Sequence, residues 1–164
     1  MTRISLIILG LLILPFATMA DCPLGQKDSH LTIGRLMRNF GRYTADADYI
    51  CIKSKNPREK ISDAEITDAT ADLGIAIECA EQVLKNPTGD VLPTKLVFMT
   101  DEKEKAKLVD DYIYFMTDFK DALIEYRKVI SELGTMKPSE RNYSEACEKY
   151  EDVDNLVNRA HKKL

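Results

Sequence analysis

The sequence predicts an all-α protein that folds as an antiparallel up-down-up-down four-helix bundle. Two observations support this prediction. Glycine and proline occur at only a few places, and the long segments between them repeat apolar residues every three or four positions. None of these segments shows the strict alternation of apolar and polar residues that is typical of a half-buried strand. Short connections within the first and second pairs of segments favour antiparallel neighbours.

Four helices are predicted, at about residues 29–53, 63–85, 101–133 and 138–164. Ser62 and Glu65 have the spacing of a capping box before the second helix. Thr100 is the expected N-cap of the third helix, and Gly134 is its expected C-terminal stop. Tyrosines on the apolar stripes of the third and fourth helices are expected to direct their hydroxyls to the surface or to one another. The predicted inward stripes consist of Ile33, Met37, Phe40, Thr44, Ala47 and Cys51; Ile66, Ala69, Leu73, Ala76, Ala80 and Val83; Leu108, Tyr112, Phe115, Phe119, Ala122, Tyr126, Val129 and Leu133; and Tyr143, Ala146, Tyr150, Val153, Val157, Ala160 and Leu164.

Residues 1–20 are predicted to be a secretory signal peptide. Arg3 is the only charge before an almost wholly apolar run from Ile4 to Phe16, and small residues precede an expected cleavage site after Ala20. This run is shorter than the roughly 20 residues that a membrane-spanning helix needs, so a retained anchor is the less favoured alternative. We therefore expect residues 21–164 to form one domain in the periplasm, with no membrane association after cleavage.

The composition is mildly acidic, with a formal net charge of −4. This charge argues against nucleic acid or an anionic membrane as the main partner. The sequence contains no Ser-His-Asp, Cys-His or phosphate-binding-loop arrangement, and no Glu-x-x-His pair for a di-iron site. No catalytic residue and no enzymatic activity are therefore predicted, and we expect a monomer.

The four cysteines predict two disulfides, since an even number in an exported chain is typical of a disulfide framework. Cys22 and Cys51 would lie at opposite ends of the first helix, roughly 35 Å apart, and cannot pair. The helix order places Cys51 with Cys147 at one end of the bundle and Cys22 with Cys79 at the other. The predicted pairs are therefore Cys51–Cys147 and Cys22–Cys79.

Met37 and His161 form the candidate site. Met37 lies on the inward stripe of the first helix, and His161, one of two histidines, lies on the inward flank of the fourth. In an up-down bundle these helices are neighbours, and both residues fall near the same end. A thioether and an imidazole are axial ligands that low-spin haem iron accepts, and closure of both positions favours electron transfer. Spacing alone leaves open the alternative that Met37 fills the core and His161 complements a helix end.

Several short strings resemble the soluble cytochrome b562 family. The C-terminal Asn158-Arg159-Ala160-His161-Lys162-Lys163 resembles the family's Asn-x-x-His-x-Lys, in which the histidine is a haem ligand. Leu36-Met37 followed by Phe40 resembles the family's methionine-bearing first helix. Further similarities are Pro93-Thr94-Lys95-Leu96, which resembles Pro-x-Lys-Leu in the second loop, and Asp121-Ala122-Leu123, which matches Asp-Ala-Leu in the third helix.

This resemblance implies a periplasmic electron-transfer protein that binds haem b without a covalent link. Its iron would be held by Met37 and His161, and it would exchange electrons with an unknown periplasmic redox partner. Leu108 and Tyr112 fall at the positions of the family's pocket phenylalanines, and Ile33 and Phe40 would pack on either side of Met37. The alternative is a haem-free secreted helical bundle, held by two disulfides, that binds a protein partner or a stress ligand. A cleft between the first and fourth helices would favour haem, and closed packing would favour the alternative.

Overall fold

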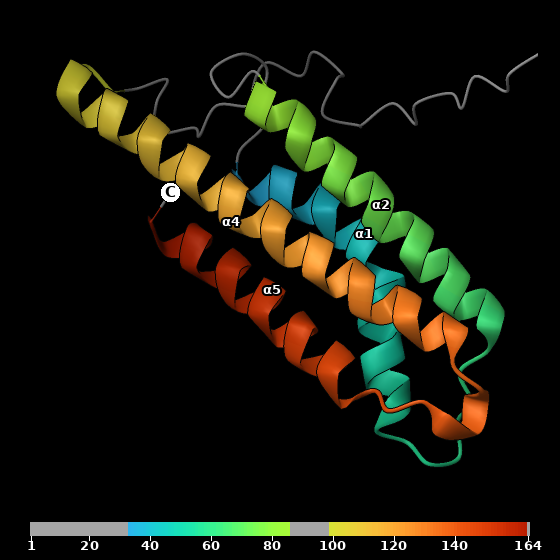
Figure 1. The fold of residues 1–164 in the computed structure, drawn as a ribbon. Helices are drawn as coiled ribbons and strands as arrows, with labels where there is room; N and C mark the ends of the chain where they lie inside the picture. The colour runs from blue at the N-terminus through green and yellow to red at the C-terminus, as the bar shows by residue number, and fades with distance from the viewer. Residues whose placement is uncertain (1–32, 86–98, 164) are drawn as a thin grey trace, which may run out of the picture.

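The computed structural model describes residues 33–85 and 99–163, with the backbone alone at 33–39, 161 and 163. Within these ranges the protein is all-helical, with four long helices and no strand (Figure 1). None of the described helices is long and apolar enough to cross a membrane. The expected signal peptide lies outside the described residues.

The four long helices are α1 (Ile33–Ser54), α2 (Asp63–Lys85), α4 (Glu102–Thr135) and α5 (Ser144–Lys163). A short 3-10 helix, η2 (Pro138–Glu140), precedes α5. The predicted bounds of the second helix are confirmed. The first helix is described only from Ile33, so its expected start at residue 29 lies outside the described part.

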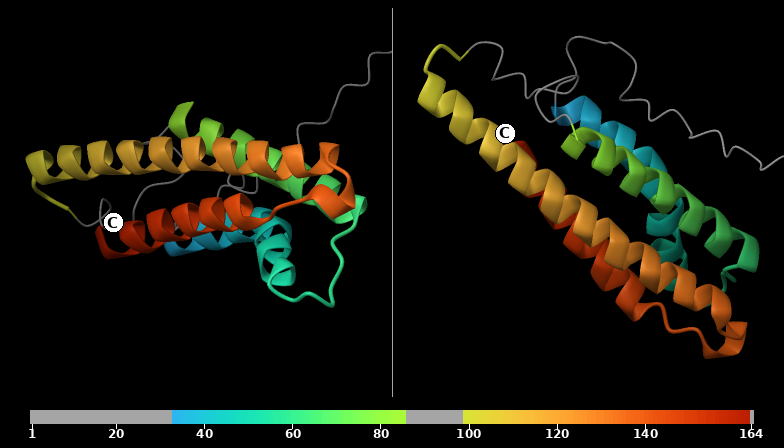
Figure 2. Two further views of the ribbon diagram at one scale, coloured as in Figure 1. Left: turned by 60° about the horizontal axis from the view of Figure 1, so that its bottom comes forward. Right: turned by 45° about the horizontal axis from the view of Figure 1, so that its top comes forward.

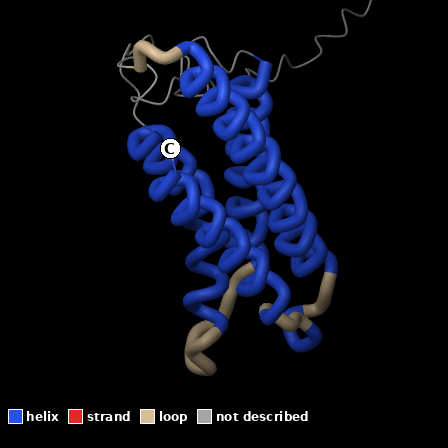
Figure 3. The backbone as a smooth tube through the Cα atoms, turned by 90° about the vertical axis from the view of Figure 1, so that its left-hand side faces the viewer, coloured by secondary structure: helices blue, strands red, loops and turns tan. Residues whose placement is uncertain are grey.

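The helices surround one common core. α2 packs against α1 and α4, and α5 packs against the same two helices. α1 and α4 therefore lie diagonally opposite each other (Figure 2). Figure 3 shows the helices side by side along one direction. The end of α1, the start of α2, the end of α4 and the start of α5 lie together at one end of the molecule (Figure 1). We call this the disulfide end, because Cys51 and Cys147 are bonded there.

The predicted apolar stripes form the core wherever the structure describes their side chains. All six stripe residues of α2 are buried. In α4 the stripe is buried except at Ala122, which is half-buried. In α5, Ala146, Val153 and Ala160 are buried, whereas Tyr150 and Val157, like Tyr143 just before the helix, are only half-buried. The fourth helix therefore lies further toward the surface than its sequence pattern predicted.

The predicted cap residues of the third helix are wrong at both ends, although its predicted bounds agree with α4 to within two residues. Asp101, not Thr100, is the N-cap of α4: its Oδ1 accepts hydrogen bonds from the backbone N–H groups of Lys103 (2.8 Å) and Glu104 (3.1 Å). Gly134 does not stop the helix, which continues to Thr135. A Cβ at position 134 would lie 3.3 Å from Cγ2 of Ile66, so the glycine allows α4 to approach α2 closely.

The fourth long helix begins at Ser144, six residues later than predicted. Pro138 starts the separate turn η2 instead, and the chain is extended at Arg141. Asn142 then accepts a hydrogen bond at Oδ1 from the backbone N–H of Ser144 (3.0 Å), which stabilises the new helix start.

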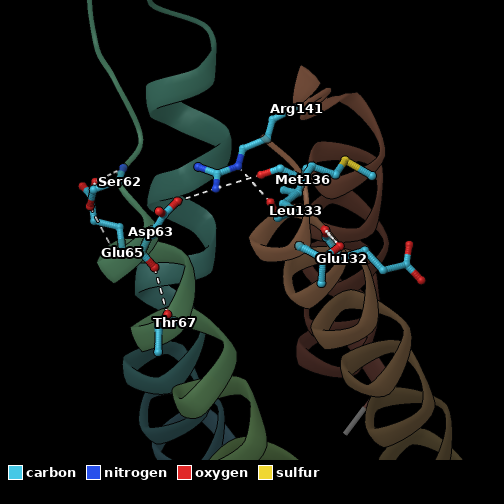
Figure 4. A network of polar contacts seen from close by, with 9 residues as sticks. Ser62, Asp63, Glu65, Thr67, Glu132, Leu133, Met136 and Arg141 are labelled. Carbon is cyan, nitrogen blue, oxygen red and sulfur yellow. Dashed lines mark hydrogen bonds and ion pairs between the residues drawn. The ribbon is translucent and has the colours of Figure 1, made fainter. Parts of the chain in front are cut away.

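Arg141 connects the elements at the disulfide end (Figure 4). Its Nε donates a hydrogen bond to the carbonyl oxygen of Leu133 (2.8 Å), and its Nη2 donates to that of Met136 (3.2 Å). Nη2 also forms an ion pair with Asp63 at the start of α2. The Arg141 side chain is 1% exposed, so this guanidinium is an internal cap for the C-terminal carbonyls of α4.

Candidate functional site

The Cys51–Cys147 disulfide joins α1 to α5, and this predicted pair is therefore present in the structure. The two Cα atoms are 5.1 Å apart, and the residues are separated by 96 positions in the sequence. The predicted partner of Cys79, Cys22, lies outside the described residues. Cys79 itself is buried in α2, and the described part of the chain contains no free cysteine.

Met37 and His161 are equally far from this disulfide along the chain. Met37 precedes Cys51 by 14 residues within α1, and His161 follows Cys147 by 14 residues within α5. Fourteen residues are two heptads, or about 21 Å of helical rise. α1 and α5 pack against each other, so the two positions lie on neighbouring helices. The side chains of both residues, and that of Ile33, lie outside the described part.

A layer of buried aromatic rings lies in the core, and it begins at Phe40, three residues after Met37 in the sequence. Phe40, 2% exposed, places its ring edge-on to that of Phe119 across the core, with ring centroids 4.9 Å apart. Phe115 stacks on Phe119 at 5.7 Å. Phe115 and Phe119 lie on the predicted inward stripe of the third helix but were not among the predicted site residues. The sequence signal for their contact is their spacing of four residues, which places Phe115 and Phe119 on the same face of the helix.

Leu108 and Tyr112, the other two predicted pocket residues in α4, are buried as expected. The hydroxyl of Tyr112 has no hydrogen-bond partner among the described residues. Burial raises the pKa of this phenol, so it stays protonated and remains a hydrogen-bond donor. The expectation that core tyrosine hydroxyls reach the surface or one another is therefore wrong at Tyr112, because its ring points too deeply into the core.

A hollow lies between α4 and α5, beside Ala160. Its volume is about 100 Å³, and Phe115, Leu156 and Ala160 supply its apolar walls. Pockets that bury an organic ligand measure roughly 300–1,000 Å³. This hollow is therefore too small for a haem. It lies between α4 and α5, whereas the cleft expected for haem lies between α1 and α5, where the side chains of Met37 and His161 are outside the described part.

The donor types of the candidate site suit haem iron. Methionine sulfur and histidine nitrogen are accepted axial ligands, and Phe40, Leu108 and Phe115 provide apolar surroundings. Elsewhere in the described residues, no group of three or more His, Cys, Asp or Glu side chains is arranged to hold a metal ion.

A polar cluster lies between α1, α4 and α5, closer to the disulfide than Met37 and His161 are. Thr44 Oγ1 donates a hydrogen bond to Asp48 Oδ2 (3.1 Å). The buried hydroxyl of Tyr126 faces the Asp48 carboxyl. Burial raises the pKa of Asp48 to about 6, against the lowering effect of the Thr44 and Tyr126 interactions, and the negative charge of Asp154 raises it further.

Comparisons of the chain with protein families, with curated proteins and with solved structures gave no significant match. The resemblance to the cytochrome b562 family therefore depends on the short strings quoted from the sequence.

Proposed function

We propose that the protein is an antiparallel up-down-up-down bundle that binds haem b between Met37 and His161 and transfers single electrons in the periplasm. This proposal rests on the equal separation, in residues along the chain, of Met37 from Cys51 and of His161 from Cys147. If α1 and α5 run in opposite directions from the disulfide, Met37 and His161 reach the same level. After two heptads, Met37 lies close to the helix face of Cys51, and His161 lies close to that of Cys147. The angular offset around the helix is about 20° per heptad.

The connections at the disulfide end support the antiparallel arrangement. Only residues 55–62 link α1 to α2, and residues 136–143 link α4 to α5. Such short connections favour neighbours that run in opposite directions. The packing of α5 against both α1 and α4 is compatible with this topology.

Each residue of the proposed site has a defined role. The Met37 thioether and the His161 imidazole would hold both axial positions of the iron, and Phe40, Leu108 and Phe115 would exclude water. Tyr112 would provide a buried hydroxyl donor. The haem would supply a one-electron iron couple, whose potential is raised by methionine ligation. Because neither axial position stays open, these residues favour electron transfer over substrate binding.

A haem-free helical bundle that binds a protein partner is the second candidate function. The burial of the predicted pocket residues of α4 is compatible with it, since Leu108 and Phe115 are each 8% exposed and Tyr112 is fully buried. In this case Met37 is a core residue and His161 lies at a helix end without a ligand role.

An absorption spectrum of the full-length protein, exported with haem available, separates the two candidates. The haem proposal predicts sharp α and β bands and a red-shifted Soret band after reduction with dithionite. Met37→Ala and His161→Ala should each abolish this low-spin reduced spectrum while far-ultraviolet circular dichroism retains the helix signal. His30→Ala and Met116→Leu are the controls, because they change the other histidine and a methionine of α4.

A visible spectrum without these bands, even after titration with haem, would contradict the haem proposal and favour the haem-free bundle. Retention of the reduced low-spin spectrum in both the Met37 and the His161 variants would show that other residues hold the iron.

A further inference from the structure

The two cysteines of the Cys51–Cys147 disulfide differ in their access to solvent. Cys51, in α1, is 1% exposed and lies on the same inward face as Ala47, one turn before it. Cys147, in α5, is only half-buried. A reagent dissolved in water can therefore reach the bond from the Cys147 side.

Cys147 lies in the wall of a surface hollow of about 570 Å³ at the disulfide end. Ser54 and Lys55 line this hollow at the end of α1, and Glu148 and Glu151 line it from α5. Ser54 Oγ lies 3.7 Å from Cys147 Sγ, so the sulfur faces another lining residue. We call this feature the disulfide hollow.

The disulfide hollow has the size that a small organic molecule requires. Pockets that bury such a ligand measure roughly 300–1,000 Å³, and the disulfide hollow falls within this range. Two cations, Lys55 and Arg141, and two acids, Glu148 and Glu151, are among its lining residues. The hollow therefore carries no strong charge of either sign, and size rather than charge decides which molecule reaches Cys147.

We propose that the Cys51–Cys147 disulfide is a thiol-exchange site, at which a small-molecule thiol attacks Cys147 through the disulfide hollow. The thiolate of the small molecule forms a bond to Cys147 Sγ, and the bond between the two cysteines breaks. Its electron pair leaves with Cys51 Sγ, which then takes a proton from water. Attack by Cys51 on the mixed disulfide expels the small thiol and restores the original bond, so the exchange is reversible.

Exchange at Cys147 removes the covalent link between α1 and α5. The buried residues of α5 are mostly small, namely Ala146, Val153 and Ala160, whereas α4 buries aromatic and long aliphatic side chains. α5 therefore depends on the disulfide more than α4 does, and exchange allows α5 to open locally. This consequence does not require haem, so it applies to either candidate function.

The direction of attack can be measured on the full-length protein with glutathione as the thiol. At successive times N-ethylmaleimide blocks the free thiols. Trypsin then separates Cys51, Cys79 and Cys147 into different peptides, because lysine or arginine lies between them. Mass spectrometry should first find glutathione on Cys147 and maleimide on Cys51. Glutathione first on Cys51, equal adducts on both cysteines, or no glutathione on Cys147 at any time would overturn the proposal.

Glu151→Trp tests the route through the disulfide hollow. Glu151 lies one turn after Cys147 on the same face, and helical side chains lean toward the N-terminus, so the indole should cover the sulfur. The adduct should form about tenfold more slowly, because exchange depends on access to the attacked sulfur. Glu145→Trp, an exposed change on α5 outside the hollow, is the matched control and should react at the unchanged rate. Equal rates in both variants, with circular dichroism showing both folded, would overturn attack through the hollow.

The opening of α5 can be measured on Cys51→Ala, in which glutathione on Cys147 is stable because no second thiol expels it. Amide hydrogen exchange of this adduct, compared with the unchanged disulfide-bonded protein, should show a larger loss of protection in residues 144–163 than in residues 63–85. An equal loss in both segments, or no loss in α5, would overturn the proposed release of this helix.

Discussion

Cys51 and Cys147, which are 96 residues apart in the sequence, join helices α1 and α5. Their bond fixes α1 against α5 at one end, and the proposed ligand positions lie two heptads away on the same two helices. A cross-link that closes a loop of this length restricts the unfolded chain, which is a model-dependent stabilisation of about 4–5 kcal/mol.

Replacement of both cysteines, Cys51→Ala/Cys147→Ala, should therefore lower the free energy of unfolding by about 2–5 kcal/mol. Urea unfolding, followed by circular dichroism, measures this loss. The variant is a sharper test than chemical reduction, because a reductant acts on every disulfide of the chain. Ser54→Ala serves as the control, since Ser54 Oγ lies 3.7 Å from Cys147 Sγ without contributing to the bond. An unchanged urea midpoint in the double cysteine variant would refute the prediction.

Arg141→Ala should lower the free energy of unfolding by about 2 kcal/mol, because the carbonyls of Leu133 and Met136 lose a charged donor. Asp63→Asn should cost less than about 1 kcal/mol, because the Asp63 side chain is 78% exposed and the amide oxygen of asparagine can still accept a hydrogen bond from Arg141. Urea unfolding of both variants tests this ranking. A larger loss in Asp63→Asn would mean that the ion pair, rather than the capping of α4, stabilises this end.

The start of α2 is a complete capping box. Ser62 Oγ accepts a hydrogen bond from the Glu65 backbone N–H (3.2 Å), and Glu65 Oε2 accepts one from the Ser62 backbone N–H (2.8 Å). Ser62→Ala should lower the free energy of unfolding by about 1 kcal/mol, measured in urea. Glu78→Ala, an exposed change in the middle of the same helix, is the control. An equal loss in both variants would contradict a specific capping role.

Glu65 also links this helix start to α1, since its Oε1 lies 2.5 Å from Lys53 Nζ. The Lys53 ammonium, followed by the Ser62 hydrogen bonds, lowers the pKa of Glu65 to about 2 from 4.5. A lowered folded-state pKa stabilises the protein above pH 4.5, and this stabilisation is lost as the pH falls toward 2. The difference in unfolding free energy between the unchanged protein and Glu65→Gln should therefore shrink between pH 5 and pH 2. A difference that stays constant over this range would contradict the assignment.

The second helix was predictable because its local signals agree. The capping box at Ser62 defines its start, Pro87 follows its end, and its apolar residues keep one helical stripe. The start of α5 was not predictable in the same way. It depends on Arg141, whose partners lie at the end of α4 and the start of α2, and these tertiary contacts leave no periodic signal in the sequence.

The candidate site was only partly predictable for a related reason. Apolar periodicity correctly identified Phe40, Leu108 and Tyr112 as buried. The contact of Phe40 with Phe119 depends on how far α4 is shifted along α1, and a stripe contains no information about the relative shift of two helices. The Tyr112 hydroxyl lacks a hydrogen-bond partner among the described residues for the same reason, because its depth is set by the neighbouring helices.

Asp48 should make the stability of the protein decrease as the pH rises from about 4 to 7. Its pKa is raised from 3.8 to about 6 in the folded protein, mainly by burial. A raised pKa means that the protonated carboxyl stabilises the fold fully below pH 3.8, and this contribution disappears as the pH rises through about 6. The groups that face it are Thr44 on α1, Tyr126 on α4, and Tyr150 and Asp154 on α5.

Asp48→Asn tests this prediction, because an amide replaces the carboxyl without a titrating proton. The variant should gain stability relative to the unchanged protein as the pH rises from 4 to 7, and the difference should level off above the pKa of Asp48. Urea midpoints at a series of pH values measure this difference, with Asp110→Asn, an exposed change on α4, as the matched control. A difference that is flat with pH would mean that Asp48 is ionised in the folded protein throughout this range, and that water or a side chain outside the described residues solvates its buried oxygen.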